Sequence, residues 1–456
     1  MGRAFVLGCA LLLSACASFT PGNPPLARYA PEAGYRFERL ESGDNSDELF
    51  VILTFSGGGT RAAALAYGVL EALRDTAIQW RGRSLPLLDE VDVISSVSGG
   101  SFPAAYYALR GRRIFDEFPE RFLYRPVQSD LIKLALSPWS WLKLAAPAYG
   151  RSDLAAEFYH REVFAGATYA DVIARNRRPF VILNATDMST GAQFPFIQDQ
   201  FDLMCSDLAG VPLARAAASS SAFPGGLTAL TFQNYAGSCG YRQPAWVQLA
   251  FEDHGSRVNP RRTARAGNRL SLAAEGPAKR AYIHLTDGGV ADNIGLRGPL
   301  EAIASTNHPW SVLQRMNQKR IDKLVVIVVN AATDPATVRD QSARVPGFID
   351  TMTTAAAVPL DNYSFDTVEL LSKTVNEFNT DARQLPAGHK VDLYPIQVAF
   401  DYISSPDERT WFKNLPTTFE LPRETVDRLR AVGRRLLNED PQFRNLMKAL
   451  KGKPPD

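Results

Sequence analysis

Short runs of consecutive apolar residues recur along the chain, separated by longer stretches in which apolar positions follow helical spacing. The apolar runs occupy residues 49–55, 91–95, 180–185, 282–286 and 324–329. Runs of this length are typical of strands buried on both faces of a sheet. Helical stretches such as residues 61–73 lie between them. The alternation predicts an α/β fold with a mainly parallel central sheet.

Three of these runs end in turns that are rich in glycine or serine. Ser56-Gly57-Gly58-Gly59 follows the first run, residues 96–100 follow the second, and Asp287-Gly288-Gly289 follows the fourth. In open α/β sheets, ligands bind beyond the carboxyl ends of the strands. We therefore expect the glycine loop, Ser98 and Asp287 to meet at that edge of the sheet.

Two further segments have no place in this alternation. Residues 115–165 are predicted as an insertion, and residues 131–143 within it mix Leu, Ile, Trp and Lys. This composition favours an interfacial lid or membrane-docking face, with a pair of core helices as the alternative. Residues 334–456 contain a predicted strand at 391–399 and a charged helix but no chemical signature. They are predicted as a C-terminal extension of a domain that spans residues 48–333.

The N-terminal segment has the pattern of an export signal. Arg3 is followed by an apolar stretch over residues 4–13 and by the sequence Leu13-Ser14-Ala15-Cys16. The apolar stretch is too short to span a bilayer as a lasting helix. The sequence ending at Cys16 resembles the bacterial lipobox, in which cleavage leaves a lipid-modified cysteine. The resemblance implies a signal peptide over residues 1–15 and a lipid anchor at Cys16; a chance cysteine is the alternative.

Composition gives further indications of the location and the partners of the protein. Residues 16–47 are rich in Pro, Gly and charge, which predicts a tether behind the anchor. Ala17 follows the cysteine, which favours a bacterial outer membrane, on its periplasmic side. The net charge is +2, so nothing indicates a nucleic-acid partner. No segment identifies a protein partner.

Two cysteines remain in the predicted mature chain, Cys205 and Cys239. Exported proteins fold in an oxidising compartment, where an even pair favours a disulfide. Closing this loop would stabilise the fold by on the order of 4 kcal/mol in the chain-entropy model. Two unpaired thiols are the alternative.

Ser98 is the best candidate nucleophile among the local serines. A serine on a sharp strand-to-helix turn needs small residues two positions before and two positions after it. Ser96 and Gly100 meet this need for Ser98, whereas Ser95 would have Val93 and Val97 in those places. A Ser/Gly-rich helix cap is the alternative.

The glycine loop strengthens this interpretation. Gly57, Gly58 and Gly59 follow a buried strand and open a helix, so their backbone N–H groups and the helix dipole suit a developing oxyanion. The Lys-Ser/Thr ending of a phosphate-binding P-loop and the spacing of a dinucleotide turn are both absent. Arg61, just inside the helix, either faces a substrate phosphate or makes an ordinary structural contact.

Asp287 ends a predicted strand and precedes two glycines, which let the backbone turn sharply and expose the carboxylate. As a general base it would take the proton of Ser98 directly. A solvated aspartate is too acidic for that role near neutral pH, so the site should desolvate it. An ordinary Asp-Gly turn is the alternative.

Five segments in this order resemble the patatin-like phospholipases. They are residues 56–62, the turn around Ser98, residues 185–191, residues 220–224, and residues 287–290 with Asn293. The Ser-Gly-Gly-Gly-x-Arg form of the first is also similar to that of the cytosolic phospholipase A2 branch.

The resemblance covers roughly residues 48–300 and implies a patatin-like three-layer fold. It implies a Ser98–Asp287 dyad without a catalytic histidine, an oxyanion hole from the glycine loop, and no metal or cofactor. Esters of phospholipid or lysophospholipid would be cleaved through an acyl-serine intermediate. Two features depart from the family pattern: Ser96 stands where glycine is usual, and Asp292-Asn293-Ile294 stands where Asn-Asn-Pro is usual.

Three alternatives stay open. A conventional Ser–His–Asp esterase would use His308 or His389 as the third member, although neither lies in a local motif. A transacylase would form the same acyl-serine and transfer its acyl group to an alcohol instead of to water. An outer-membrane binding lipoprotein would keep the fold without activity.

Overall fold

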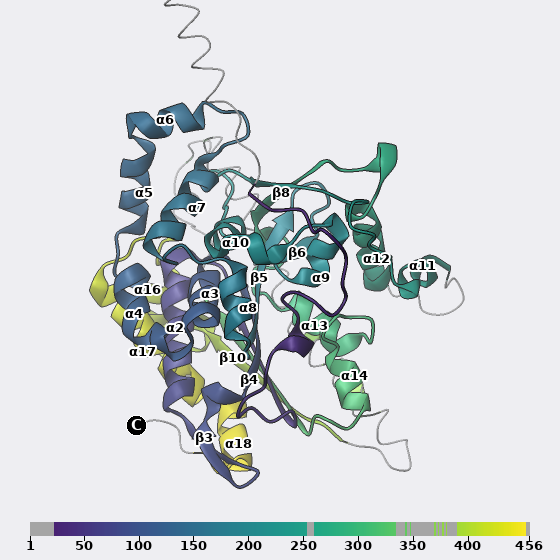
Figure 1. Ribbon diagram of the computed structural model, residues 1–456. Helices are drawn as coiled ribbons and strands as arrows, with labels where there is room; N and C mark the ends of the chain where they lie inside the picture. Colours follow the sequence, from purple (N-terminus) through teal and green to yellow (C-terminus); the bar gives the residue numbers. More distant parts are fainter. Residues whose placement is uncertain are drawn as a thin grey trace, which may run out of the picture.

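Figure 1 shows a computed structural model of the chain, which describes residues 22–252, 260–333 and 390–452 and isolated positions between 343 and 380. The predicted signal peptide, Cys16 and His389 lie outside the described residues. Among the residues that are described, no helix is long and apolar enough to cross a bilayer.

The core of the fold is a sheet with strand order β10-β9-β1-β4-β5-β8-β7. The five strands from β10 to β5 run parallel, β8 and β7 are antiparallel to their neighbours, and short β6 pairs with β5. A separate hairpin joins β2 and β3. The prediction of a mainly parallel α/β sheet is confirmed. The strands span Leu49–Phe55 (β1), Ala77–Trp80 (β2), Arg83–Pro86 (β3), Val91–Val97 (β4), Phe180–Asp187 (β5), Gln193–Pro195 (β6), Leu230–Gln233 (β7), Tyr282–Asp287 (β8), Lys323–Asn330 (β9) and Asp392–Ala399 (β10).

Helices cover both faces of the sheet, so the fold has three layers. In Figure 1, α2, α3 and α17 lie on one side of the sheet and α13 and α14 lie on the other. Strand β1 is buried along its whole length between β4 and β9, as its apolar run predicts. The α-helices span Gly59–Asp75 (α2), Ser101–Arg110 (α3), Ile114–Phe118 (α4), Val127–Ala135 (α5), Pro138–Leu144 (α6), Arg151–Glu162 (α7), Tyr169–Arg175 (α8), Gln198–Phe201 (α9), Leu213–Ser220 (α10), Ala245–Glu252 (α11), Pro260–Leu272 (α12), Arg297–Ala304 (α13), Val312–Asn317 (α14), Pro406–Lys413 (α16), Arg423–Glu439 (α17) and Pro441–Ala449 (α18).

The N-terminal segment after residue 21 is packed against the domain, so the prediction of a tether over residues 16–47 is wrong for this part. Tyr35 and Phe37 are buried in the main core. Arg36 forms an ion pair with Asp202 at 2.6 Å. The sequence did not predict this packing, because the segment has few aromatic residues and is otherwise rich in Pro and Gly.

Cys205 and Cys239 form a disulfide beside this N-terminal segment. The backbone N–H of Leu26 donates to the Cys205 carbonyl at 2.7 Å, and that of Tyr29 donates to the Cys239 carbonyl at 2.9 Å. The disulfide therefore joins two loops that together hold the start of the described chain.

The C-terminal residues complete the sheet, so the boundary predicted at residue 333 does not separate two structural units. Strand β10 pairs with β9 along its whole length, with Asp392 opposite Lys323. Helix α17 lies against α2. The backbones approach closely, because a Cβ on Gly68 would lie 2.2 Å from the carbonyl oxygen of Arg430. The β9 pairing and the α2 contact depend on the tertiary fold, which local patterns do not show.

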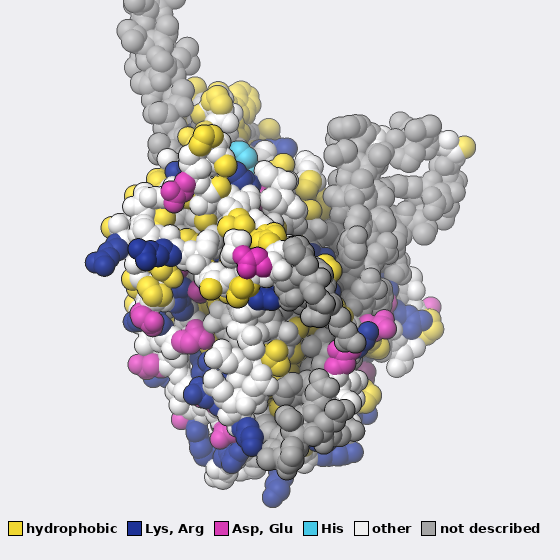
Figure 2. All heavy atoms as spheres, turned by 90° about the vertical axis from the view of Figure 1, so that its right-hand side faces the viewer, with side chains coloured by type: hydrophobic (Ala, Val, Ile, Leu, Met, Phe, Trp, Pro, Cys, Tyr) yellow, Lys and Arg dark blue, Asp and Glu magenta, His cyan; other side chains and the backbone are white. Residues whose placement is uncertain are grey.

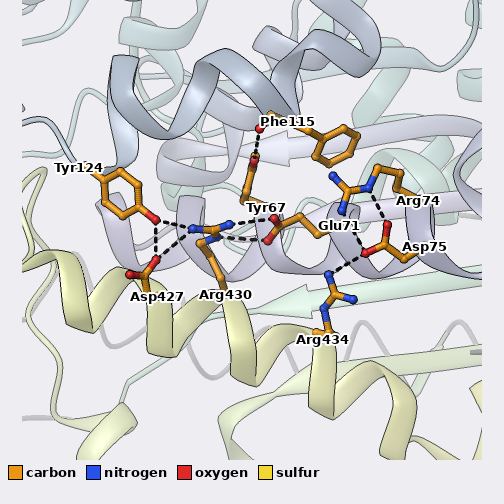
Figure 3. A network of polar contacts seen from close by, with 9 residues as sticks. All are labelled: Tyr67, Glu71, Arg74, Asp75, Phe115, Tyr124, Asp427, Arg430 and Arg434. Carbon is orange, nitrogen blue, oxygen red and sulfur yellow. Dashed lines mark hydrogen bonds and ion pairs between the residues drawn. The ribbon is translucent and has the colours of Figure 1, made fainter. Parts of the chain in front are cut away.

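A network of polar contacts fastens α17 to α2 (Figure 3). Arg430 makes two hydrogen bonds to the carboxylate of Glu71, at 2.8 and 3.1 Å. Arg434 donates to Asp75 at 2.8 Å, one helical turn further along. The bidentate contact of Arg430 and the contact of Arg434 together fix the register of the two helices.

Helices α5 and α6 lie in the predicted insertion and carry an exposed apolar patch. Trp139 is 79% exposed and Trp141 is 59% exposed. Figure 1 places α6 at the top of the molecule. This exposure favours the predicted interfacial segment over a pair of core helices. The α5–α6 patch consists of Ile132, Leu136, Trp139, Trp141 and Leu142.

Candidate active site

Ser98 lies in a tight turn between β4 and α3. Its φ of 51° is in the left-handed region, which non-glycine residues rarely adopt. A Cβ on Gly99 would lie 2.1 Å from the carbonyl oxygen of Gly59, and one on Gly100 would lie 2.7 Å from the Cβ of Phe55. The turn is therefore packed directly against the glycine loop, where larger residues do not fit.

Asp287 reaches Ser98 from an antiparallel strand. Val97 pairs with Asn184 of β5, and the next residue, Ala185, pairs with Asp287 of β8. This register sets the end of β8 beside the end of β4. The hydroxyl of Ser98 donates to Oδ2 of Asp287 at 2.8 Å. The structure thus brings the two predicted residues into direct contact.

Asp287 is only 3% exposed. Burial raises the pKa of Asp287 to about 7, and hydrogen bonds from the Gly289 N–H and from Ser98 oppose this shift. The Gly289 N–H donates to Oδ1 at 2.8 Å, which leaves Oδ2 for the serine. Both protonation states are therefore accessible near neutral pH, as a general base requires.

The glycine loop presents two N–H groups rather than three. The N–H of Gly57 donates to the carbonyl oxygen of Asn293 at 3.0 Å, so it is already used within the protein. The N–H groups of Gly58 and Gly59 have no partner within the described part of the chain, and both residues line the cavity of Ser98. They stand at the start of α2, where the helix dipole favours negative charge. Gly58 and Gly59 are therefore the candidate oxyanion donors.

A buried network of serines supports the turn, and sequence reasoning missed it. The hydroxyl of Ser220 accepts from the Ser98 N–H at 2.9 Å and donates to the Asn184 carbonyl at 2.6 Å. Ser101 lies 2.9 Å from Ser220 and donates to Ser96 at 3.2 Å. Ser220 belongs to a segment that resembles the family, but its role depends on this tertiary contact. The hydroxyl of Ser96 is accommodated in the same network.

Arg61 contacts protein oxygens. Its Nε donates to the Ala331 carbonyl at 2.9 Å, and its Nη1 donates to the Leu415 carbonyl at 2.6 Å. Its Nη2 donates to the hydroxyl of Thr417 at 3.1 Å. These contacts favour the structural alternative over the predicted phosphate contact. They hold residues 415–419, the C-terminal strap, over the start of α2.

The C-terminal strap covers the glycine loop. The carbonyl oxygen of Thr418 accepts from the Thr60 N–H at 2.8 Å. A Cβ on Gly59 would lie 2.3 Å from that same oxygen, so the loop must have glycine here. Phe419 packs edge-on against Phe102 of α3, with ring centroids 5.6 Å apart. A segment far along the chain therefore completes the site.

Ser98 and Asp287 open into a cavity of about 590 Å³. The dyad, the glycine loop and Asn293 belong to its polar lining, together with Arg61, Gln128, Arg151, Ser221, Thr333, Thr417 and Thr418. Helix α5 forms part of its wall and also carries the exposed α5–α6 patch. The apolar walls are formed by Leu131, Ile132, Ala135, Leu136, Leu154, Ala155, Phe223, Leu227 and Phe419.

No histidine is among the described residues that line this cavity. His308 lines a different cavity, where its ring packs 5.0 Å from the ring of Trp310. The Ser–His–Asp alternative therefore has no support from His308. Within the described residues, no group of three or more His, Cys, Asp or Glu side chains is placed to hold a metal ion.

Comparisons with solved structures give distant likenesses. Human GIVD cytosolic phospholipase A2 has a TM-score of 0.43 at 14% identity, with 89% of this chain and 62% of that chain covered. The same enzyme in complex with methyl gamma-linolenyl fluorophosphonate has a TM-score of 0.40 at 13% identity, covering 89% and 59%. VipD from Legionella pneumophila has a TM-score of 0.30 at 11% identity, covering 97% and 73%. The chain thus spans about three fifths of the length of the human phospholipase.

No curated protein matches the chain in sequence. The family model described as patatin-like phospholipase matches residues 53–300, more than half of the 456 residues. The matched region contains the glycine loop, the serine turn and the aspartate that the fold assembles around one cavity. The chain therefore belongs to the patatin-like phospholipase family.

Proposed function

We propose that this protein is a lipid acyl hydrolase of the phospholipase A or lysophospholipase type, with Ser98 as nucleophile and Asp287 as general base. The observation that carries the proposal is the 2.8 Å hydrogen bond between their side chains in the lining of a largely apolar cavity. Membership of the patatin-like phospholipase family supports a lipid ester as substrate.

In the first half-reaction, Ser98 Oγ attacks the ester carbonyl carbon while its proton moves to Asp287 Oδ2. The carbonyl oxygen becomes an oxyanion that accepts hydrogen bonds from the N–H groups of Gly58 and Gly59. Loss of one such donor typically lowers the rate by roughly 10²- to 10³-fold. The C–O bond to the lipid alcohol then breaks, the alcohol takes the proton from Asp287, and the acyl group stays on Ser98.

In the second half-reaction, water attacks the acyl-serine carbonyl carbon and gives a proton to Asp287. The bond from carbon to Ser98 Oγ breaks, and Ser98 recovers its proton from Asp287. Fatty acid leaves, and the dyad returns to its starting state. Because Asp287 acts as base and then as acid in each half, a pKa near neutrality suits both steps.

The α5–α6 patch supports a substrate in a lipid surface. Trp139 and Trp141 are exposed, and Lys143 lies beside them on α6. Aromatic and basic side chains of this kind suit a lipid–water interface. Helix α5 connects the patch to the cavity, so docking of the patch would bring the mouth of the cavity to the lipid.

The proposal is tested by fatty-acid release from phospholipid vesicles, comparing the wild type with Ser98→Ala and Asp287→Asn. Both variants should lose more than about 10³-fold in rate while remaining folded. Ser84→Ala and Asp116→Asn are matched controls, because both side chains are exposed, and they should keep full activity. Activity that survives Ser98→Ala would contradict the assignment of the nucleophile.

The same assay separates the remaining alternatives. A transacylase would release less free fatty acid and form new esters when an alcohol acceptor is added. A binding lipoprotein would release no fatty acid in the wild type. The hydrogen bond between Ser98 and Asp287 supports the hydrolase over these alternatives.

We further propose that the mature protein begins at a lipid-modified Cys16 and is anchored in the bacterial cell envelope, facing the periplasm from the outer membrane. The support is the sequence that ends at Cys16. Cys16→Ser should prevent incorporation of labelled palmitate and release the protein from the membrane fraction. Incorporation that persists in this variant would contradict the anchor.

A further inference from the structure

A second cavity of about 350 Å³ lies between β5, β6, α9, α12 and α13. It shares no lining residue with the cavity of Ser98. Figure 2 views the molecule from the side that carries α12 and α13. The lining of the second cavity includes Ser95 and Asn184, which hydrogen-bond to each other at 3.0 Å behind the serine turn. The reaction described above does not use this cavity.

Arginine dominates the charged lining of this second cavity. Arg261, Arg265 and Arg269 recur every four residues on α12, so they share one face of that helix, and Arg297 comes from α13. Glu301, also in the lining, lies 3.9 Å from Arg265.

The other two lining carboxylates have partners outside the cavity lining. Asp187 is paired with Arg280 at 2.7 Å, and Asp199 is paired with Arg36 at 2.6 Å. The described lining therefore contains four arginines and three carboxylates, those of Asp187, Asp199 and Glu301. Their formal charges sum to +1.

Three hydrogen-bond donors in the lining lack acceptors, whereas another nitrogen of Arg269 donates to the hydroxyl of Tyr241 and Arg265 donates to the Asn307 carbonyl. Trp310 Nε1, Gln193 Nε2 and Arg269 Nε are buried and have no hydrogen-bond partner within the described part of the chain. Each of these atoms can only donate. Trp310 is 1% exposed, so its N–H is well shielded from bulk solvent. Buried donors without acceptors are costly, which indicates that a ligand rich in acceptor oxygens belongs here.

His308 also lines this cavity, and the charges of the arginines affect its pKa. Burial, reinforced by the charges of Arg265 and Arg269, holds the pKa of His308 well below its usual range. His308 is therefore neutral at physiological pH and keeps an acceptor nitrogen. Its imidazole can bind a ligand hydroxyl while the arginines bind an anion.

We propose that this second cavity binds a phosphate monoester, held by Arg265 and Arg269 and by the N–H groups of Gln193 and Trp310. A phosphate offers three acceptor oxygens and up to two negative charges, which suit several donors and several arginines better than a carboxylate does. The apolar lining residues Ile182, Phe194 and Leu272 receive the carbon part of the ligand. A glycerophosphate, either free or as the head of a lipid, has this chemistry.

The test is isothermal titration calorimetry of glycerol 3-phosphate and of inorganic phosphate into the full chain carrying Ser98→Ala. Vesicles with and without phosphatidic acid form the third arm, and the Ser98→Ala background prevents turnover of the lipid. Binding to the soluble phosphates indicates a free ligand; binding to phosphatidic acid alone indicates a lipid head group. This test does not depend on hydrolase activity, so its outcome is separate from that of the proposed function.

Gly298→Leu blocks the cavity without removing a charge. A Cβ at Gly298 would meet only Gln193 Oε1, at 3.7 Å, so a larger side chain enters the cavity without a backbone clash. Gly267→Leu is the matched control, because a Cβ there meets no atom within 4 Å. Arg269→Gln removes a proposed contact, and Arg242→Gln is its exposed control.

We expect saturable binding of at least one phosphate probe, weakened about tenfold or more by Gly298→Leu and by Arg269→Gln and unchanged in both controls. The melting temperature of each variant establishes that it is folded. Binding of equal strength in folded Gly298→Leu would overturn the proposal. So would the absence of binding by all three probes.

Discussion

The hydroxyl of Ser98 donates to the carboxylate of Asp287 at 2.8 Å, although 189 residues separate the two in the chain. The contact depends on how β5 is aligned with its neighbours β4 and β8. Asn184 of β5 lies opposite Val97, and Ala185 lies opposite Asp287, so neighbouring residues of one strand place the serine and the aspartate side by side. Any change that shifts this register should separate the pair.

The pH dependence of activity should follow the ionisation of Asp287. Burial raises the pKa of Asp287 to about 7, and only the ionised form can accept the serine proton. Activity should therefore fall about tenfold for each pH unit below 7 and level off above it. The measurement is kcat/KM on a soluble short-chain ester between pH 5 and 9. A constant rate down to pH 5 would show that the base is an ordinary, solvated carboxylate.

Asp287→Asn should stabilise the protein at alkaline pH while abolishing activity. The pKa in the folded state lies above the unfolded value of 3.8, so ionisation is disfavoured in the fold and stability is lost as pH rises between these values. The amide cannot ionise, so the gain should reach at most on the order of 4 kcal/mol at pH 8 and vanish below pH 4. Denaturant unfolding at both pH values measures it. A loss of stability at pH 8 would contradict the desolvation of Asp287.

Ser220→Ala should lower kcat without unfolding the protein. The variant removes the acceptor of the Ser98 N–H, so the strained turn loses a buried contact. We expect kcat to fall about 10- to 100-fold, because small displacements of a nucleophile have effects of this size. Ser219→Ala is the control, since among the described residues that hydroxyl bonds only to the Arg215 carbonyl of its own helix, at 2.8 Å. Equal activity in the two variants would remove the supporting role.

Replacement of both Trp139 and Trp141 by Ala should reduce activity on vesicles about tenfold and leave hydrolysis of a soluble ester unchanged. Both rings are exposed on the α5–α6 patch, outside the catalytic contacts. Leu249→Ala, an exposed apolar residue of α11, is the control. Vesicle sedimentation separates binding from turnover. Equal losses on both substrates would indicate a structural defect instead of lost docking.

Local patterns predicted the parts of the site that local backbone chemistry determines. The serine turn, the glycine loop and the Asp-Gly-Gly segment each carry their own signal in a few consecutive residues. Asp287 was expected at the carboxyl end of a parallel strand, but β8 runs antiparallel to β5. The aspartate reaches the same edge because β8 begins beyond the end of β5 and runs back towards it. Strand direction is a tertiary property, so the apolar run of β8 alone could not reveal it.

The contacts that were missed are those between distant segments. The Arg61 side chain finds its partners at Ala331, Leu415 and Thr417, and nothing near Arg61 indicates them. Gly57 was expected to serve as an oxyanion donor, but its N–H is used by Asn293. The strand at 391–399 was expected, whereas its place beside β9 depends on the fold of the whole chain.

The central claim is that Asp287 activates Ser98 as a nucleophile, and covalent labelling tests it most directly. The full chain is treated with a fluorophosphonate probe near pH 8, and the modified residue is identified by peptide mass spectrometry. The account predicts one adduct, on Ser98, absent from Ser98→Ala and at least about 10²-fold slower to form in folded Asp287→Asn. A label on another residue, no label on the wild type, or undiminished labelling of Asp287→Asn would contradict it.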